Sequence, residues 1–407
     1  MSNSTGVIGL GIMGSAFAAN LAKGGVQVIG YDIDPARIDD LAGTGIQFAA
    51  SPAAVAEAAD VVVTSLPSPA AFHGVMSGAG GITECGNSAL IVIDTCTLSV
   101  DDKQAGFDAL AAKSITLLDC PVSGTGAQAA TGDLAILASG DKDAYQKALP
   151  VLQGFSRTQH YVGPFGDGSK VKYIANLLVA IHNASAAEAM VLGLKSGLDP
   201  EMLLNVLTDG AGNSRVLELR GPMMVADDYD SKVTATMKIQ DKDMGIINNY
   251  IDSLDCPAPL FKSTIGLYKD ALEGGLENSD TASVCRVLEK MAGIEREAMD
   301  QTAIIEAANI IGGLRVRPKA FAGLPEALVP TDADAAYDIQ DAVHDWFSGH
   351  GFGPRIGYKI GCTTPVMQRY MGIDHPCVGG IFEARLNHSS AEIDCASLNR
   401  PGVECEI

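Results

Sequence analysis

Short apolar runs alternate with helix-like stretches over the first 160 or so residues of the chain. Six of these runs are rich in β-branched residues and apolar at successive positions, which is typical of strands in a sheet covered on both faces. They lie at 6–11, 26–32, 60–66, 89–96, 115–122 and 134–140. Because strands that alternate with helices are joined by crossovers, the pattern predicts a largely parallel α/β sheet within residues 1–165.

The pattern changes after the glycine-rich stretch 163–168. Helical periodicity then predicts a long helix over about 169–195, followed by Gly197 and by an N-cap and first-turn pair at Asp199-Pro200. The apolar stripe of the long helix consists of Val171, Ile174, Leu178 and Ile181. Helical periodicity continues to about residue 294, so residues 166–294 are predicted to form an all-α domain.

The last segment, residues 295–407, begins with another helical stretch and then becomes rich in loops, proline and glycine. It contains Trp346, the single tryptophan of the chain, and it stops within a strand-like run at 404–407. We expect it to be a separate but incomplete α+β segment.

Charge and composition exclude several classes of protein. The 49 acidic residues exceed the 28 basic ones by 21, and a surface of that sign repels nucleic acid. No run approaches the about 18–20 apolar residues of a membrane helix, and no basic signal-peptide start is present. The nine cysteines are scattered without a CxxC pair. These features predict a reduced, cytoplasmic protein without a nucleic-acid or membrane partner.

A glycine-rich GxGxxG turn follows the first predicted strand and opens a helix. The first glycine permits the tight turn, the second lets the backbone approach a pyrophosphate, and the third lets the helix pack on the strand. The N–H groups at the helix start are then available to phosphates. The sequence therefore predicts a Rossmann-like dinucleotide-binding domain whose contact residues are Gly9, Leu10, Gly11, Ile12, Met13 and Gly14.

Asp32 ends the second strand, 23 residues after Gly9. A carboxylate there bonds the ribose hydroxyls and repels a 2′-phosphate, so NAD is favoured over NADP, although the nearby Arg37 argues for NADP. Leu66-Pro67 and the turn 94–97 follow two further strands at the edge where such sheets bind ligands. Ordinary strand-to-loop chemistry explains these two turns equally well.

Two further groups of residues are candidates for substrate binding and acid–base chemistry. The small-residue turn at Ser123, Gly124 and Thr125 offers backbone N–H groups and a hydroxyl to a carboxylate, although a plain glycine turn is an equal explanation. Lys172 and Asn176 are four residues apart on the long helix and share a face, although a helical pair of this kind is ordinarily solvent-facing. A partly buried lysine can take the proton of a substrate hydroxyl while hydride moves to nicotinamide, and an asparagine can orient that hydroxyl.

Five motifs within residues 6–294 occur in the order found in the β-hydroxyacid dehydrogenase family, which the chain resembles. They are the GLGIMG turn through Asn20-Leu21, the turn 94–97, and the segments DCPVSGTGAQAATGD (119–133), GPFGDGSKVKYIAN (163–176) and KDMG (242–245). The resemblance implies a helical domain like that of 6-phosphogluconate dehydrogenase and an active site in the cleft between the two domains. It also implies a homodimer or homotetramer.

The same resemblance assigns roles to individual residues. Lys172 matches the catalytic lysine and Asn176 the substrate-orienting asparagine, and the loop from Ser123 to Thr125 matches the one that binds the substrate carboxylate. Thr97 and Lys242 match contacts near the nicotinamide. Two departures from the family pattern, Thr125 in place of glycine and Ala175 in place of asparagine, are expected to affect substrate shape.

Residues 300–407 resemble the N-terminal part of the 2-keto-4-pentenoate hydratase family, which is related to fumarylacetoacetate hydrolases. The matching segments are AAYDIQ (335–340), GYKIGCTT (357–364), MGIDHP (371–376) and PGVECE (401–406). The resemblance implies that Glu404 and Glu406 match two ligands of a Mg²⁺ or Mn²⁺ site, and residues at i and i+2 of a strand do share a face. The third carboxylate would lie beyond Ile407, so we expect no bound metal and no hydratase activity from this chain.

The sequence thus predicts NAD-dependent oxidation, or the reverse reduction, of a small 3-hydroxy carboxylic acid such as 3-hydroxyisobutyrate. One alternative is an NADP-using reductase of the tartronate semialdehyde or succinate semialdehyde type. Another is a catalytically silent dinucleotide-binding module whose last segment binds a partner. A third is a dehydrogenase–hydratase completed by a separate chain.

Overall fold

The computed structural model describes residues 4–294, 301–316, 323–330, 333–361 and 377–385. The chain divides into two compact units, residues 1–294 and 295–407. The first unit contains every residue for which the sequence predicts a dehydrogenase role.

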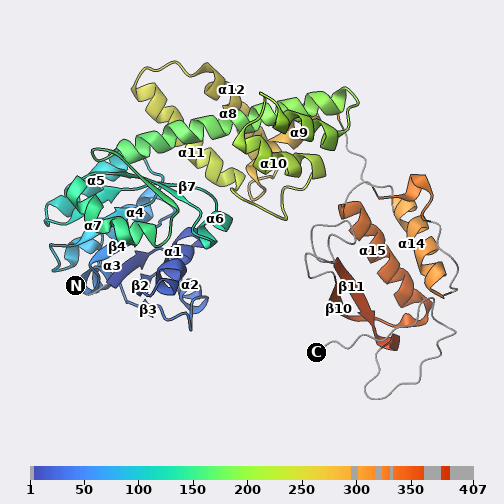
Figure 1. The fold of residues 1–407 in the computed structure, drawn as a ribbon, viewed down its shortest axis with the longest axis horizontal. Coiled ribbons are helices and arrows are strands. Elements are labelled where there is room, and N and C mark those ends of the chain that lie inside the picture. The colour runs from blue at the N-terminus through green and yellow to red at the C-terminus, as the bar shows by residue number, and fades with distance from the viewer. Residues whose placement is uncertain (1–3, 295–300, 317–322, 331–332, 362–376, 386–407) are drawn as a thin grey trace. The chain divides into compact units, whose positions relative to one another are not determined.

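A mixed sheet of nine strands forms the first part of this unit (Figure 1). Six strands match the predicted runs: β1 (Ser4–Ile8), β2 (Gln27–Tyr31), β4 (Val61–Thr64), β5 (Ile91–Asp94), β6 (Thr116–Asp119) and β8 (Ala135–Ser139). The sequence analysis missed β3 (Gln47–Phe48), β7 (Val122–Ser123) and β9 (Thr158–Gly163). The strand order is β3-β2-β1-β4-β5-β6-β8-β7, and β9 pairs with β8.

The strand order reverses between β1 and β4, which pair in parallel. All pairs from β3 to β6 are parallel, whereas β8 runs antiparallel to β6 and β7. In an open sheet of this type, ligands bind beyond the carboxyl ends of the strands at the reversal point. The Rossmann-like fold is therefore confirmed, and its binding edge is the one that follows β1, β4 and β5.

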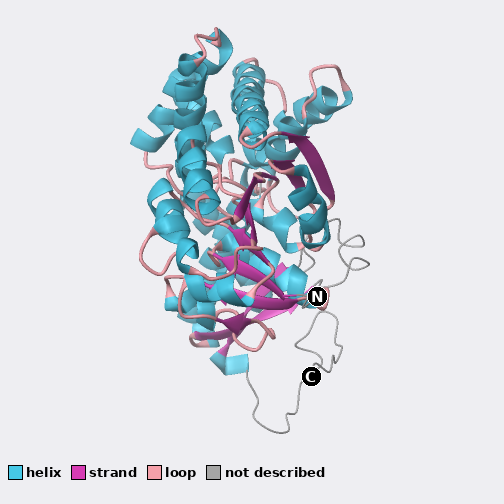
Figure 2. Ribbon diagram, turned by 90° about the vertical axis from the view of Figure 1, so that its left-hand side faces the viewer, coloured by secondary structure: helices cyan, strands magenta, loops and turns pink. Residues whose placement is uncertain are grey.

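Helices cover both faces of the sheet (Figure 2). They are α1 (Ile12–Lys23), α2 (Pro35–Asp39), α3 (Pro52–Ala58), α4 (Pro69–Ser77), α5 (Val100–Ala111), α6 (Gly126–Ala130) and α7 (Lys142–Gln153), with a short 3-10 turn, η1 (Ile82–Glu84). Phe17 and Leu21 are in the core on one face, and Phe72 and Met76 are in the core on the other. Strands that are apolar on both sides are buried on both sides, as the sequence predicts.

The second part of the unit is all helical, and α8 (Asp167–Lys195) runs along it (Figure 1). The remaining elements are α9 (Pro200–Asp209), α10 (Arg215–Ala226), α11 (Met237–Ser253), α12 (Pro259–Glu273), η2 (Thr281–Ser283) and α13 (Val284–Ala292). Gly197 has a φ of 74° after α8, and the Asp199 side chain caps α9, as the sequence predicts. The helical domain is confirmed.

The apolar stripe predicted for α8 is only partly buried, since Ile181 packs against the core but two of its other residues are exposed. Ile174 is 59% exposed and Leu178 is 48% exposed. The buried face instead carries small residues, including Ala180, Ala184 and Ala187. Because α10, α11, α12 and α13 all pack on this one helix, small side chains are needed to let their backbones approach it.

By length and hydropathy alone, α8 meets the criteria for a membrane span. Its position among the four packed helices identifies it as the core helix of a folded domain. Among the described residues, a shorter apolar helical stretch lies at Thr302–Leu314.

The described residues of the second unit form α14 (Gln301–Val316), η3 (Glu326–Leu328), α15 (Ala333–Phe347), η4 (Ser348–Phe352), β10 (Arg355–Gly361), β11 (Cys377–Phe382) and η5 (Glu383–Arg385). α14 packs on α15 through Ile304, Ala307 and Ile339. β10 and β11 form an antiparallel pair. On β10, the side chains of Tyr358 and Ile360 are exposed.

Candidate active site

The glycine turn at 9–14 has the geometry that a dinucleotide phosphate requires. Gly9 has a φ of 89°, and a Cβ there would lie 2.2 Å from the Ser65 carbonyl oxygen. A Cβ on Gly14 would lie 1.8 Å from the Gly9 oxygen, whereas a Cβ on Gly11 would meet nothing within 4 Å. The first turn of α1 contains no acidic residue, and no side chain caps it. Its N–H groups and the open space above Gly11 therefore fit a phosphate group.

Asp32 is fixed beside this turn. Its Oδ2 accepts a hydrogen bond from the Leu10 N–H (2.6 Å), and its Oδ1 accepts one from the Asp34 N–H (2.9 Å). The carboxylate thus adjoins the glycine turn, as the predicted ribose contact requires. Arg37 lies on α2 within 4.0 Å of the carboxylates of Asp34 and Asp40, so this competing cation has two acidic neighbours of its own.

The turns after β4 and β5 are joined to each other at the same edge of the sheet. The Leu66 N–H donates to Cys96 Sγ (3.0 Å), and Thr95 Oγ1 donates to the Thr64 carbonyl (2.7 Å). The predicted cofactor residues Leu66, Pro67 and Thr97 therefore belong to two connected loops that follow adjacent parallel strands.

The turn at 123–125 leads from β7 into α6. Gly124 has a φ of 143°, and a Cβ there would lie 2.4 Å from Leu134, so a side chain is excluded. Ser123 is exposed. Thr125 caps α6, because its Oγ1 accepts from the Gln128 N–H (3.4 Å) while Gln128 Oε1 accepts from the Thr125 N–H (3.0 Å). Thr125 thus shapes the loop through a capping box.

Lys172 and Asn176 project from α8 towards α11. Asn176 Nδ2 donates to Asp243 Oδ2 (2.9 Å), and Asp243 is buried, with 7% exposure. Lys242, the neighbour of Asp243 on α11, donates to the Thr97 carbonyl (2.9 Å). The structure therefore brings together four predicted residues, with Thr97 in the nucleotide-binding domain and the others, Lys172, Asn176 and Lys242, in the helical domain. Asp243 bonds to Asn176 and acts on the charge of Lys172.

Burial lowers the pKa of the Lys172 amine below its usual value. The negative charge of Asp243 partly offsets this effect by raising that pKa, and the positive charge of Lys242 lowers it further. Lys170, two residues earlier, is half-exposed and paired with Asp167 (2.9 Å), which raises its pKa. Of these two neighbouring lysines, only Lys172 has the surroundings of an acid–base group.

The sequence analysis did not assign a role to Asp243, although it quoted the KDMG segment. A carboxylate next to a lysine on a helix is ordinarily solvated, and nothing in the spacing shows that this one faces α8. Only the packing of α11 on α8 places it against Asn176.

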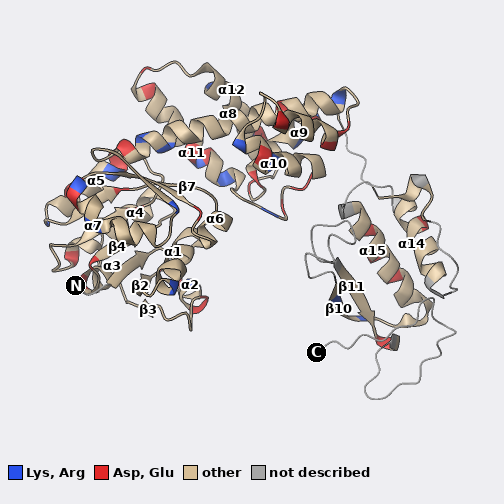
Figure 3. Cartoon of the chain, in the orientation of Figure 1, with Lys and Arg blue, Asp and Glu red and all other residues tan. Residues whose placement is uncertain are grey.

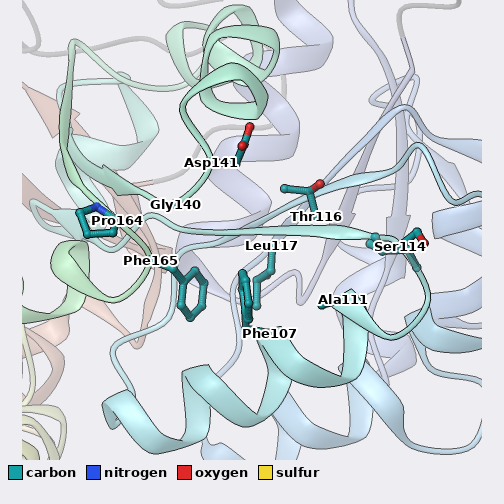
Figure 4. Close-up of a pocket in the computed structure, with 10 residues that line it drawn as sticks. Phe107, Ala111, Ser114, Thr116, Leu117, Gly140, Asp141, Pro164 and Phe165 are labelled. Atoms are coloured by element: carbon teal, nitrogen blue, oxygen red, sulfur yellow. The ribbon is translucent and has the colours of Figure 1, made fainter.

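A separate groove of about 450 Å³ lies at the amino end of β6 (Figure 4). Phe107 and Phe165 line it, with ring centroids 4.5 Å apart. Its one charged side chain, Asp141, accepts a hydrogen bond from the Ala144 N–H and caps α7. None of the predicted site residues lines this groove, so it is distinct from the candidate active site.

Two predicted residues, Glu404 and Glu406, lie outside the described residues. Within the part of the chain that the structure describes, no three His, Cys, Asp or Glu side chains are arranged to hold a metal ion. Acidic and basic residues are interspersed over both parts of the first unit (Figure 3).

Comparison with known proteins covers the same first unit. Residues 4–163 match the family described as the NAD-binding domain of 6-phosphogluconate dehydrogenase, and residues 166–288 match that described as NAD-binding of NADP-dependent 3-hydroxyisobutyrate dehydrogenase. L-threonate dehydrogenase of Cupriavidus necator is 34% identical over 288 residues, which are 70% of this chain and 96% of that protein. The chain belongs to the β-hydroxyacid dehydrogenase family.

Solved structures agree with this membership. A 3-hydroxyisobutyrate dehydrogenase from Salmonella typhimurium shares 30% identity with a TM-score of 0.63, covering 70% of this chain and 99% of that one. The 3-hydroxyisobutyrate dehydrogenase of Mycobacterium tuberculosis, determined with L-serine, shares 27% identity with a TM-score of 0.65, covering 71% and 99%. As a β-hydroxyacid dehydrogenase, the chain is an oxidoreductase that uses NAD(P). The matched families end at residue 288, so the hydratase resemblance of the last segment stays a prediction.

Gly11 provides a test of the cofactor site that does not depend on the substrate. Because a side chain at Gly11 would fill the space for the pyrophosphate without a clash, Gly11→Val should weaken NADH binding at least about tenfold while leaving the melting temperature nearly unchanged. Titration of NADH fluorescence measures the first quantity and thermal unfolding the second. Gly74→Val, in open space on α4, is the matched control and should bind NADH normally. Normal NADH binding by Gly11→Val would contradict this assignment of the site.

Proposed function

We propose that this β-hydroxyacid dehydrogenase oxidises a small 3-hydroxy carboxylic acid with NAD⁺, with Lys172 as the proton relay. The main support is the convergence of Lys172, Asn176 and Asp243, together with the bond from Lys242 to Thr97 in the turn after β5. This bond joins the helix that carries Asp243 to a loop at the predicted cofactor edge. In this proposal, Lys172 accepts the proton near the edge of the sheet where a bound nicotinamide would accept the hydride.

The dinucleotide supplies the hydride acceptor when it is bound. The C–H bond of the substrate carbinol breaks with its electron pair leaving as hydride, and the O–H proton passes to the neutral amine of Lys172. The carbon–oxygen bond thereby becomes a carbonyl, and Lys172 is left as an ammonium ion. Asn176, held by Asp243, orients the hydroxyl, and the Ser123–Gly124 turn holds the substrate carboxylate.

The substrate class follows from chemistry that the related proteins share. 3-Hydroxyisobutyrate, L-threonate and L-serine, which are named for relatives of this chain, each carry a carboxylate and a hydroxyl on the third carbon. A loop that binds the carboxylate and a lysine that reaches the hydroxyl suffice for all three. Discrimination among them then depends on side chains near the second carbon, such as Thr125 and Ala175.

Asp32 supports NAD over NADP, because its fixed carboxylate would repel a 2′-phosphate. The second candidate, an NADP-using semialdehyde reductase, rests on Arg37 and on the NADP-dependent family matched by the helical domain. A catalytically silent module is the weaker alternative, because Lys172 is present, is partly buried and has a lowered pKa, as an acid–base group requires. Rates with NAD⁺ and with NADP⁺ on the same substrates decide between the two cofactors.

We also propose that the protein is a cytoplasmic homodimer or homotetramer. The exposed apolar side chains of Ile174 and Leu178 on α8 support self-association, because such residues are ordinarily buried. Five cysteines of the described residues are free thiols, as expected in a reducing compartment. Light scattering of the purified protein should give at least twice the mass of the chain, and a monomer would contradict this proposal.

Replacing Lys172 tests the central role. Lys172→Ala should lower kcat about 10²–10⁴-fold, because the hydroxyl loses its proton acceptor, while NADH binding is retained. Lys170→Ala is the matched control and should change kcat by less than about twofold, because this lysine is half-exposed. The assay follows NADH formation with 3-hydroxyisobutyrate, threonate, glycerate and 3-hydroxypropionate. Unchanged turnover in Lys172→Ala would contradict the proposal.

The pH dependence of kcat/KM tests the electrostatics of Lys172. Oxidation requires the neutral amine, so the rate should rise as pH increases through the pKa of Lys172. Asp243 favours the charged ammonium form and raises that pKa. The isosteric Asp243→Asn substitution should therefore lower the pKa and shift the rising limb to lower pH. A limb that stays in place or moves to higher pH would show that Asp243 does not act on Lys172.

A further inference from the structure

A buried ionic cluster lies beside the candidate active site. Lys103 on α5 is fully buried and pairs with Asp94 at the end of β5 and with Asp119 at the end of β6 (2.9 Å). Both aspartates are also fully buried. Asp94 accepts a further bond from Thr64 Oγ1 (2.6 Å), so the cluster joins the carboxyl ends of three neighbouring strands.

The cluster contains two carboxylates and one ammonium ion. The two negative charges raise the pKa of Lys103, so the lysine is charged. Removing charged groups from water is unfavourable, and an arrangement of this kind persists where hydrogen bonds satisfy the remaining oxygen atoms. The groups that satisfy Asp119 are therefore informative.

The Asp119 carboxylate accepts a hydrogen bond from Ser139 Oγ on β8 (3.4 Å) and two from the first turn of α8. Its Oδ2 accepts from the Ser169 N–H (2.7 Å), and its Oδ1 accepts from Ser169 Oγ (2.9 Å). The Gly168 N–H donates to Ser139 Oγ (2.9 Å), and this hydroxyl donates to the Asp119 carbonyl (3.1 Å). A Cβ on Gly168 would lie 2.4 Å from the Leu137 carbonyl oxygen, so the helix start is pressed against the strand ends.

The next turn of α8 is fixed to the cofactor edge as well. The Tyr173 hydroxyl donates to the carbonyl of Leu98, next to Thr97. Ser169 and Tyr173 lie on either side of Lys172 along the helix and within one turn of it. Both the rotation and the axial position of α8 at Lys172 are therefore set by hydrogen bonds to the nucleotide-binding domain.

We infer that Asp119, held by Lys103, is a positioning residue for catalysis: through Ser169 it sets the orientation of α8 that aims Lys172 at the substrate hydroxyl. This inference rests on the proposed role of Lys172. Its physical basis is that a small misplacement of a catalytic group from its reacting atom costs a large part of the rate. A purely structural cluster would support folding and leave the behaviour of Lys172 unchanged when one of its bonds is removed.

Ser169→Ala is the principal test, because it removes one hydroxyl from a buried aspartate. Thr234→Val is the matched control, since Thr234 Oγ1 donates to the buried Asp280 (2.7 Å) in the helical domain, away from the start of α8. Ser139→Ala removes the second link to α8 and is the fallback should Ser169→Ala fold poorly. All variants are made in the full chain and compared by melting temperature, NADH affinity, kcat and the pH dependence of kcat/KM.

Ser169→Ala should lower kcat about tenfold with NADH affinity unchanged, while Thr234→Val should keep its kcat at a similar loss of melting temperature. The rising limb of the pH profile should move to higher pH, because a displaced Lys172 regains contact with water. Of the described groups around this amine, Asp243 and Lys242 are the charged ones that act on it, and neither is altered in these variants. The inference would be overturned if Ser169→Ala left both kcat and the pH profile of kcat/KM unchanged. It would also be overturned if Ser169→Ala and Thr234→Val lost kcat equally.

A readout without turnover separates this inference from the proposed function. Reductive ¹³C-methylation labels lysines for NMR, and the Lys172→Arg variant identifies the signal of Lys172. The titration of that signal should shift to higher pH in Ser169→Ala and stay in place in Thr234→Val. If the wild-type protein oxidises no hydroxyacid, the proposed function fails whatever the signal does. If the enzyme is active but the Ser169→Ala signal titrates as in the wild type, only the positioning role fails.

Discussion

The hydrogen bonds between Asp119 and the first turn of α8 connect the two halves of this enzyme. Asp119 ends a strand of the nucleotide-binding sheet, and α8 is the helix around which α10, α11, α12 and α13 pack. A buried carboxylate requires several hydrogen-bond donors, and the N–H groups at the start of a helix are such donors. The arrangement thereby satisfies a charge and a helix terminus at the same time.

This connection explains how one site can be assembled from distant parts of the chain. The proposed site takes residues from the glycine turn, the turns after β4 and β5, the 123–125 loop, α8 and α11. Cofactor and substrate groups must be held within a fraction of an ångström for hydride transfer. In this protein the bond from Lys242 to the Thr97 carbonyl adds a second point of attachment between the helical domain and the cofactor edge.

The surroundings of Lys172 illustrate how a helix can carry two different lysines. Lys170 is half-exposed and pairs with Asp167, which raises its pKa, whereas burial lowers the pKa of Lys172. The difference arises from the rotation of α8, because residues two apart on a helix face nearly opposite directions. A feature that fixes this rotation therefore also determines which lysine has acid–base properties.

The sequence alone determined the fold class of the first unit and most of the candidate site. Continuous β-branched runs specify buried strands, and a glycine turn between a strand and a helix has few alternative structures, so β1, α1 and the dinucleotide edge were predictable. The spacing of Lys172 and Asn176 places them on one helical face, but such a pair is ordinarily solvent-facing, and only the resemblance to the family singled them out. The strand runs and the glycine turn are local patterns, so they can be interpreted from the sequence without knowledge of how the elements pack.

Tertiary structure decided the rest. The apolar residues Ile174 and Leu178 are exposed because α8 needs small residues where four helices cross it. Asp243 and Lys103 carry no sequence signal that distinguishes them from solvated charges. Asp243 bonds to Asn176, which is 67 positions away in the chain, and Lys103 pairs with Asp119, which is 16 positions away. A charged side chain acquires a buried partner only when the fold brings the two residues together. Periodicity along the chain does not show which distant residues will be in contact.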